Sequence, residues 1–279
     1  MEIRRSEKAG IHITSIKGQD LPIEAEKNVA GVAGLAILKA HNAQLGFEIR
    51  IEKNIKPGSG IGSSAASAAG TVAGINYLLG NPFTNKELIP FAMEGERLAC
   101  GSAHADNVAP ALLGGFTLVR DTNPLDICAL PTPLELVATV IHPKIEVKTA
   151  DARAVLKKRV TLEKAISQWG NVGALVSSLY EEDYDLLSRS LVDGIVEPAR
   201  SILIPYFKEL KAACKEGGAL GSGISGSGPS VFALSRGMST ANKVAQAMQS
   251  VLEETNIPFD IHVSPVKKTG VSFIEDLLT

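Results

Sequence analysis

The stretch Pro57-Gly-Ser-Gly-Ile-Gly-Ser-Ser-Ala-Ala-Ser-Ala-Ala-Gly70 joins an alternating apolar segment to a run rich in alanine. Glycines at every second position from 58 to 62 allow positive φ and let a ligand approach the backbone. Alanine favours helix, so we expect a helix behind the loop, with Ser63 or Ser64 as its N-cap. Free amides at a helix N-terminus attract anions, most often phosphate. The stretch predicts an anion-binding loop; a tight glycine-rich turn at a helix entry is the simpler alternative.

Two common nucleotide-binding motifs do not fit this loop. It lacks the Gly-Lys-Ser/Thr ending of the P-loop, and its evenly spaced glycines do not match Gly-x-Gly-x-x-Gly. The loop therefore belongs to another class of anion site.

Composition limits the remaining possibilities. The chain has 279 residues, 45% of them hydrophobic, which is enough for two domains of ordinary size. A net charge of −2 without a Lys/Arg block argues against a nucleic-acid partner. No apolar run is long enough to span a bilayer, and the first residues are not of signal-peptide type. Cys100, Cys128 and Cys214 lack paired spacing, so we expect reduced thiols in a cytoplasmic protein without a zinc site.

The first half of the chain alternates strand and helix patterns. Apolar residues predict a strand that ends at Gly18, a helix from Asn28 to about 42, and a strand over 46–53. Lys53 and Lys56 flank the loop and are interpreted as solvated. The alanine-rich helix continues to about Leu79. A capping box at Thr84 opens the next helix, in which Pro90 indicates an early kink or a late start. A strand over 116–120 and a loop over 121–133 follow, and we place a domain boundary near the end of that loop.

The second half predicts a small sheet with helices. We expect strands over 134–141, 230–234 and 259–265, and a glycine-rich segment over 221–230. Expected helices begin near Ala150 behind a Thr149 cap and continue over 162–180, 185–195, from about 198, 204–214 and 241–252. This order is typical of a split βαβ, ferredoxin-like domain.

Further stretches accompany the loop: Gly101-Ser-Ala-His-Ala-Asp-Asn-Val-Ala-Pro110 with Gly114-Gly115, Lys148-Thr-Ala-Asp-Ala-Arg153, Glu197-Pro-Ala-Arg200, and the glycine-rich 221–229. The 57–66 loop resembles the central phosphate loop of the GHMP kinases, and 221–229 resembles their C-terminal glycine motif. The 104–110 stretch narrows the resemblance to homoserine kinases. The resemblance covers nearly the whole chain.

This resemblance implies an α+β GHMP kinase fold. Residues 1–133 would form an ATP-binding, ribosomal-protein-S5-domain-2-like domain, and residues 134–279 a ferredoxin-like domain. The implied reaction is ATP-dependent phosphorylation of L-homoserine to O-phospho-L-homoserine in threonine biosynthesis, with Mg²⁺ as cofactor. The resemblance further implies a cytoplasmic homodimer whose partners are homoserine and ATP, with no nucleic acid and no membrane.

The resemblance also implies roles for single residues. The ATP-binding positions would be Asn28, Pro57, Gly58, Ser59, Gly60, Ile61, Gly62, Ser63 and Ser64. Glu96 and Ser64, with Ser63 as the alternative hydroxyl, would bind Mg²⁺, and Glu94 competes with Glu96. A solvated helix carboxylate is the simpler interpretation of Glu96, and a helix N-cap is the simpler interpretation of Asn28.

The acceptor residues implied by the resemblance are Asp106, Asn107, His104, Arg153, Arg200 and Gly226. A carboxylate near a hydroxyl is a plausible general base. Positioning and charge stabilisation by Asn107 offer a route without a base, so the role of Asp106 stays open. Asp106 is otherwise a helix N-cap, and each arginine a surface ion pair. Arginine matches the substrate carboxylate bidentately.

One departure qualifies the resemblance. Homoserine kinases begin with a Pro-Ala-Ser-Ser-Ala-Asn type motif and a Gly-x-Gly-Phe-Asp segment, which this sequence lacks. We expect the chain to start inside the first sheet, with a lone strand, an unpaired edge and an incomplete acceptor pocket. Two alternatives therefore stay open: another GHMP kinase, of mevalonate or sugar type, and an inactive remnant of the fold.

Overall fold

The computed structural model describes residues 1–279 except 43, 102, 146, 148–151, 153 and 275–279. The chain forms two compact units. Unit 1 contains Met1–Pro57, Gly62–Ala129 and Lys267–Thr279, and unit 2 contains Gly58–Ile61 and Leu130–Val266. The helix start expected at Thr149 and Ala150 lies outside the described residues.

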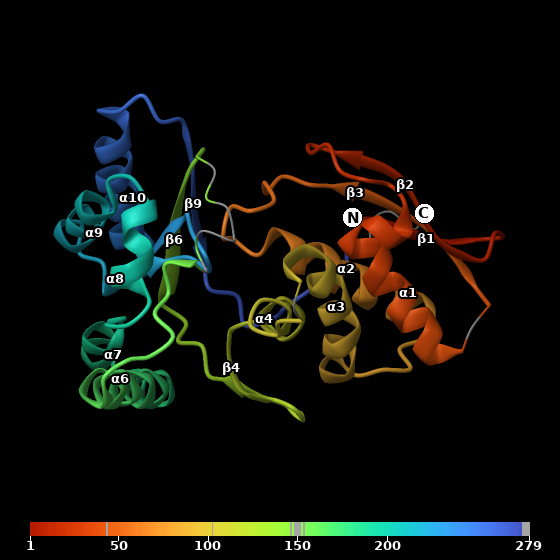
Figure 1. Ribbon diagram of the computed structural model, residues 1–279, viewed down its shortest axis with the longest axis horizontal. Coiled ribbons are helices and arrows are strands. Elements are labelled where there is room, and N and C mark those ends of the chain that lie inside the picture. Colours follow the sequence, from red (N-terminus) through yellow and green to blue (C-terminus); the bar gives the residue numbers. More distant parts are fainter. Residues whose placement is uncertain (43, 102, 146, 148–151, 153, 275–279) are drawn as a thin grey trace. The chain divides into compact units, whose positions relative to one another are not determined.

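A three-stranded sheet forms one layer of unit 1 (Figure 1), in the order β1 (Glu2–Ser6), β3 (Gly46–Glu52), β2 (Gly10–Lys17). The central strand β3 is antiparallel to β1 and parallel to β2. Parallel neighbours need a crossover, which η1 (Ala25–Lys27) and α1 (Val29–His41) supply here. The predicted alternation of β3 is confirmed, since Phe47 and Ile49 are fully buried.

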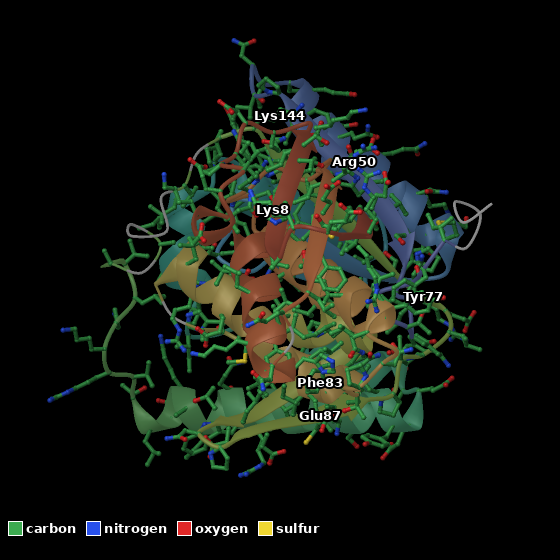
Figure 2. All side chains as sticks on the ribbon, turned by 90° about the vertical axis from the view of Figure 1, so that its right-hand side faces the viewer. Lys8, Arg50, Tyr77, Phe83, Glu87 and Lys144 are labelled. Atoms are coloured by element: carbon green, nitrogen blue, oxygen red, sulfur yellow. The ribbon has the colours of Figure 1, made fainter. Side chains whose placement is uncertain are left out.

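Helices form the second layer of unit 1, on one face of this sheet: α1, α2 (Ser63–Leu78) and α3 (Asn85–Cys100), with the short α4 (Val108–Leu113) beside them. The Thr84 capping box is confirmed. Pro90 lies inside α3, so the expected late start of that helix is wrong. In Figure 2, Lys8 and Arg50 lie on the sheet side of this unit, and Tyr77 and Phe83 on the helical side.

The start of the chain differs from the expected lone strand. Residues 1–18 contain two strands, and both pair with β3. The sequence of β1 is Glu-Ile-Arg-Arg-Ser, which lacks the apolar alternation by which a strand is recognised. These polar residues form a strand in their pairing with β3. Arg4 of β1 also forms an ion pair with Glu48 of β3 at 2.6 Å.

The expectation of a loop over 121–133 is wrong for most of this range, up to Leu130. Residues 116–130 form a two-stranded hairpin of β4 (Phe116–Thr122) and β5 (Leu125–Leu130). The segment after Val266 also returns to unit 1, where Gly115 N donates to Lys267 O at 2.7 Å. Gly114 and Gly270 leave no room for side chains at this contact.

Unit 2 contains the predicted ferredoxin-like sheet. Its order is β7 (Gly221–Ile224), β8 (Val231–Arg236), β6 (Leu136–Pro143), β9 (Phe259–Pro265), with every neighbouring pair antiparallel. Helices α9 (Phe207–Glu216) and α10 (Met238–Glu253) pack on it (Figure 1). The core between them includes Ile141, Leu210 and Val244, which are fully buried. The short β7 has glycine at two of its four positions and was expected only as part of a glycine-rich segment.

The other helices that the structure describes in unit 2 are α6 (Leu162–Glu181), α7 (Tyr184–Ser190), α8 (Glu197–Arg200) and the 3₁₀ turn η2 (Ser201–Leu203). The helix expected over 185–195 ends at Ser190. Asp193 then accepts hydrogen bonds from the amides of Ile195, Val196 and Glu197, in the turn that leads into α8. Throughout the described ranges, every helix is too short or too polar to cross a bilayer.

Candidate active site

The glycine-rich loop has the backbone geometry that its sequence predicts. Gly58, Gly60 and Gly62 have φ of 76°, 80° and 72°. Residues other than glycine rarely adopt such values, so the alternating glycines are required by the conformation of the chain. A Cβ on Gly60 would also collide with the Ser225 carbonyl oxygen, whereas one on Gly58 would meet open space.

Within unit 2, the loop is attached to the turn between β7 and β8. Ser225 Oγ donates to Gly60 O at 2.8 Å, and Ser230 Oγ donates to Ser59 O at 2.6 Å. A Cβ on Gly226 would lie 3.0 Å from Gly60 O. The two glycine-rich stretches of the sequence therefore pack backbone against backbone.

Helix α2, which belongs to unit 1, begins directly after the loop, and no serine caps its N-terminus. Gly62 occupies the N-cap position, and as a glycine it has no side chain to cap the first-turn amides. The Ser63 hydroxyl donates instead to Ile55 O at 2.7 Å, so the expected serine cap is wrong. The first amides of a helix without a cap have no intrahelical partner. The start of α2 thus presents N–H groups and the positive end of a helix dipole.

Lys53 lies beneath this helix start and was wrongly expected to be solvated. Its side chain is buried, and Nζ donates to Ser63 O at 2.8 Å and to Ser67 Oγ at 2.6 Å. Burial lowers the pKa of this lysine, whereas the nearby Glu96 carboxylate raises it. The alternation at 47, 49 and 51 places position 53 on the buried face, so this signal was present in the sequence. Lys56 is exposed.

Glu96 on α3 is the buried carboxylate beside this helix start, and only 3% of the residue is exposed. Burial raises its pKa, while a hydrogen bond with Ser64 and the charges of His104 and Lys53 lower it. Oε1 of Glu96 has no hydrogen-bond partner among the described residues. The competing Glu94 is only half-buried and pairs with Arg97 at 3.1 Å. Geometry therefore favours Glu96 over Glu94, and Ser64 over Ser63, as hard oxygen ligands.

The acceptor candidates of unit 1 lie close to this carboxylate. Asp106 raises the pKa of Glu96 and His104 lowers it, which places both charges near that side chain. Asn107 Oδ1 would lie 3.7 Å from a Cβ on Gly62, so the amide adjoins the end of the loop. The N-cap of α4 is Asn107, without a side-chain bond to the helix, so the N-cap interpretation of Asp106 is wrong.

In unit 2, the structure brings Arg200 and Gly226 together. Arg200 Nη1 donates to Gly226 O at 3.2 Å, and its Nε donates to Ala152 O at 3.1 Å. These bonds orient the guanidinium and leave further N–H groups for a ligand. Arg153 lies outside the described residues.

Asn28 is the N-cap of α1. Its Oδ1 accepts from Ala30 N at 3.0 Å, and its Nδ2 donates to Pro22 O at 2.7 Å. The structural interpretation of this residue is therefore confirmed, and it does not exclude a ligand on the remaining amide hydrogen.

Comparison with known proteins agrees with this geometry. Residues 27–115 match the GHMP kinases N terminal domain, and residues 175–254 match the GHMP kinases C terminal family. A homoserine kinase of Chlorobium phaeobacteroides is 47% identical over 98% of this chain and 88% of the relative. The crystal structure of homoserine kinase from Cytophaga hutchinsonii has a TM-score of 0.92 and 52% identity, covering 96% of this chain and 86% of that one.

More distant structures share the fold alone. L. major mevalonate kinase, crystallised with R-mevalonate, has a TM-score of 0.68 at 17% identity and covers 94% of this chain and 85% of its own. The chain belongs to the GHMP kinase family, whose fold it has. Within that family, it belongs with the homoserine kinases, to which it is similar over nearly its full length.

Proposed function

We propose that the protein transfers the γ-phosphoryl group of ATP to the side-chain hydroxyl of L-homoserine, giving O-phospho-L-homoserine and ADP. The observation that carries this proposal is the buried Glu96 carboxylate, which lies near Ser64 at a helix N-terminus without a side-chain cap. Phosphoryl transfer needs groups that cradle phosphate, a cation and a held acceptor. The similarity to homoserine kinases supports the choice of acceptor.

The phosphates would bind to amides from Gly58 to Ser64, including the open start of α2. Glu96 and Ser64 suit Mg²⁺, because this ion takes one or two carboxylate or hydroxyl oxygens and keeps several waters and phosphate oxygens. Oε1 of Glu96 has no hydrogen-bond partner among the described residues, so it is available to bind a metal ion. When bound, Mg²⁺ would neutralise charge that develops on the phosphate oxygens.

The acceptor hydroxyl would be held by Asn107, with Asp106 beside it. Asp106 is an exposed carboxylate near Glu96. It is a candidate base, and orientation of the hydroxyl by Asn107 is the alternative route. Arg200 and Arg153 would bind the α-carboxylate of homoserine, and Gly226 and His104 would make further contacts with the amino acid.

Several finer assignments belong to the same proposal. Asn28 would lie near the adenine. Residues 1–133 and 134–279 would be the two GHMP kinase domains, except that the segment after Val266 returns to the first unit. We further propose a cytoplasmic homodimer. Its support is an exposed apolar face on α6, where Leu162, Ile166 and Trp169 are 67%, 55% and 64% exposed.

Turnover tests the proposal directly. The purified protein with Mg·ATP is offered homoserine, mevalonate and galactose in parallel, and ADP release and the phosphorylated product are measured. Phosphohomoserine is the expected product, with little turnover of the other two. Turnover of mevalonate or galactose alone would assign the protein to another GHMP kinase class, and failure with all three would indicate an inactive member of the fold.

A further inference from the structure

A buried histidine, which has no part in the proposed reaction, is connected to the phosphate loop through one serine. His142 on β6 and Ser230 at the start of β8 are 4% and 0% exposed. His142 Nδ1 lies 3.0 Å from Ser230 Oγ, and Ser230 Oγ lies 2.6 Å from Ser59 O in the loop. All three residues belong to unit 2.

The direction of these hydrogen bonds follows from their chemistry. The Ser59 carbonyl can only accept, so the single Ser230 hydroxyl proton is donated to it. The Ser230 oxygen must then accept from His142, which places a proton on Nδ1 of the imidazole. A second bond, from Ser230 N to Ser59 O at 3.4 Å, reinforces the hold on this carbonyl.

Holding the Ser59 carbonyl also orients the next amide. The Ser59–Gly60 peptide is trans, and in a trans peptide the C=O and N–H point in opposite directions. The Gly60 N–H therefore points away from Ser230, and it has no hydrogen-bond partner in the described part of the chain. Glycine at position 60 has the backbone freedom to let this peptide rotate. Rotation would turn a carbonyl dipole, in place of an amide, toward a bound anion.

We propose that His142 is a positioning residue, which acts through Ser230 to keep the Ser59–Gly60 peptide with its amide presented to a phosphate oxygen of ATP. This inference rests on the proposed function. The relay itself consists of side chains that are nearly inaccessible to solvent, so the peptide orientation is set before the nucleotide binds. Such preorganisation lowers the cost of ordering the loop on binding.

Three substitutions test the relay. His142→Leu removes the donor, His142→Asn keeps a nitrogen donor near the Nδ1 position, and Ser230→Ala removes the connecting hydroxyl. We expect His142→Leu and Ser230→Ala each to raise the Kd and KM for ATP about tenfold, the equivalent of one net hydrogen bond. The KM for homoserine should change less than twofold, and His142→Asn should restore most of the ATP affinity. The double variant His142→Leu/Ser230→Ala should be no weaker than Ser230→Ala alone, because the two act as one unit.

Thr139→Val is the matched control. Thr139 is a fully buried residue of the same strand, and its Oγ1 donates to Ala241 O at 3.2 Å, away from the loop. We expect it to lower thermal stability without changing the KM for ATP. An unchanged ATP affinity in Ser230→Ala, equal loss in His142→Asn and His142→Leu, or the same loss in Thr139→Val would overturn the relay.

Calorimetry and turnover together distinguish a failure of the relay from a failure of the proposed reaction. Wild-type protein that binds ATP in calorimetry but does not phosphorylate homoserine would contradict the proposed function, and the same calorimetry would still test the relay. If the wild-type protein is active but the His142 and Ser230 variants bind ATP with unchanged Kd and KM, the proposed function stands and the relay is rejected.

Discussion

The Lys53 ammonium and the Ser67 hydroxyl form a buried hydrogen bond of 2.6 Å on the inner side of α2. The same ammonium donates to Ser63 O at 2.8 Å, which fixes it under the first turn of the helix. Its charge lowers the pKa of Glu96, and the Glu96 carboxylate in turn raises the pKa of Lys53. The ionisation of the candidate metal ligand is therefore linked to a lysine that serves as an internal counter-charge.

Replacing that lysine should shift the pH dependence of the reaction. Lys53→Met removes a positive charge that favours ionised Glu96, so the pKa of Glu96 should rise further. We expect the acidic limb of the pH profile of kcat/KM for Mg·ATP to move to higher pH. Lys56→Met, at an exposed position beside the loop, is the control and should leave the limb in place. An unmoved limb in Lys53→Met would show that the two charges are not coupled in the working enzyme.

Glu96 and Glu94 provide a second matched pair, for metal use. Glu96→Gln keeps the shape of the side chain but removes the charge that would face Mg²⁺, and we expect kcat/KM for Mg·ATP to fall about a hundredfold. Glu94→Gln, on the same helix but only half-buried and paired with Arg97, should be close to wild type. Titration of activity with Mg²⁺ measures both. The assignment of the metal ligand fails if the two variants respond alike.

The same Glu96→Gln substitution should stabilise the fold at neutral pH. Burial raises the pKa of Glu96 above its ordinary 4.5, so between pH 4.5 and the raised value the folded protein binds more protons than the unfolded chain. The free energy of unfolding then falls as pH rises through this window, and the ionised carboxylate destabilises the fold above it. Glutamine has no such charge.

Urea unfolding of wild type and variant across this pH range measures the effect. The stability advantage of Glu96→Gln should be largest at neutral pH and should shrink as the pH falls towards 4.5. Glu94→Gln should show no such trend. If the stability advantage of Glu96→Gln is independent of pH, burial does not penalise the ionised carboxylate.

Local patterns in the sequence predicted most of the elements that build the site. The apolar alternation of 46–52, the alanine-rich run behind the loop and the Thr84 capping box each specify their element within a few residues. The positive φ of the loop glycines also follows from their spacing, because little else explains glycine at every second position.

The parts that were missed depend on contacts distant in sequence. The strand β1 is polar and is a strand only in its pairing with β3, and β7 needs β8 in the same way. The side-chain bonds at the helix start show the same limit. Ser63 was expected as a cap, but its hydroxyl meets Ile55 O, eight residues earlier. The connection from His142 through Ser230 to Ser59 joins residues that are 88 and 171 positions apart in the sequence, and no local pattern indicates it.

Arg200 supplies a test of substrate recognition. Its Nε and Nη1 are held by the carbonyls of Ala152 and Gly226, so the guanidinium is oriented before a ligand arrives. If its remaining N–H groups bind the carboxylate of homoserine, Arg200→Ala removes charge-assisted hydrogen bonds worth about 1.5–3 kcal/mol. The KM for homoserine should then rise about 10- to 150-fold, while the KM for ATP changes little.

Lysine at this position separates charge from geometry. Arg200→Lys keeps the positive charge but loses the planar fork and its bonds to the two carbonyls, so we expect only partial recovery of the KM for homoserine. Arg236→Ala is the control, since that arginine lies in the same unit and pairs with Glu135 at 2.7 Å. Steady-state kinetics with each substrate varied in turn distinguish the outcomes. Equal increases in both KM values for Arg200→Ala would indicate a general disturbance of the fold, and Arg200 would then have no specific role in binding the amino acid.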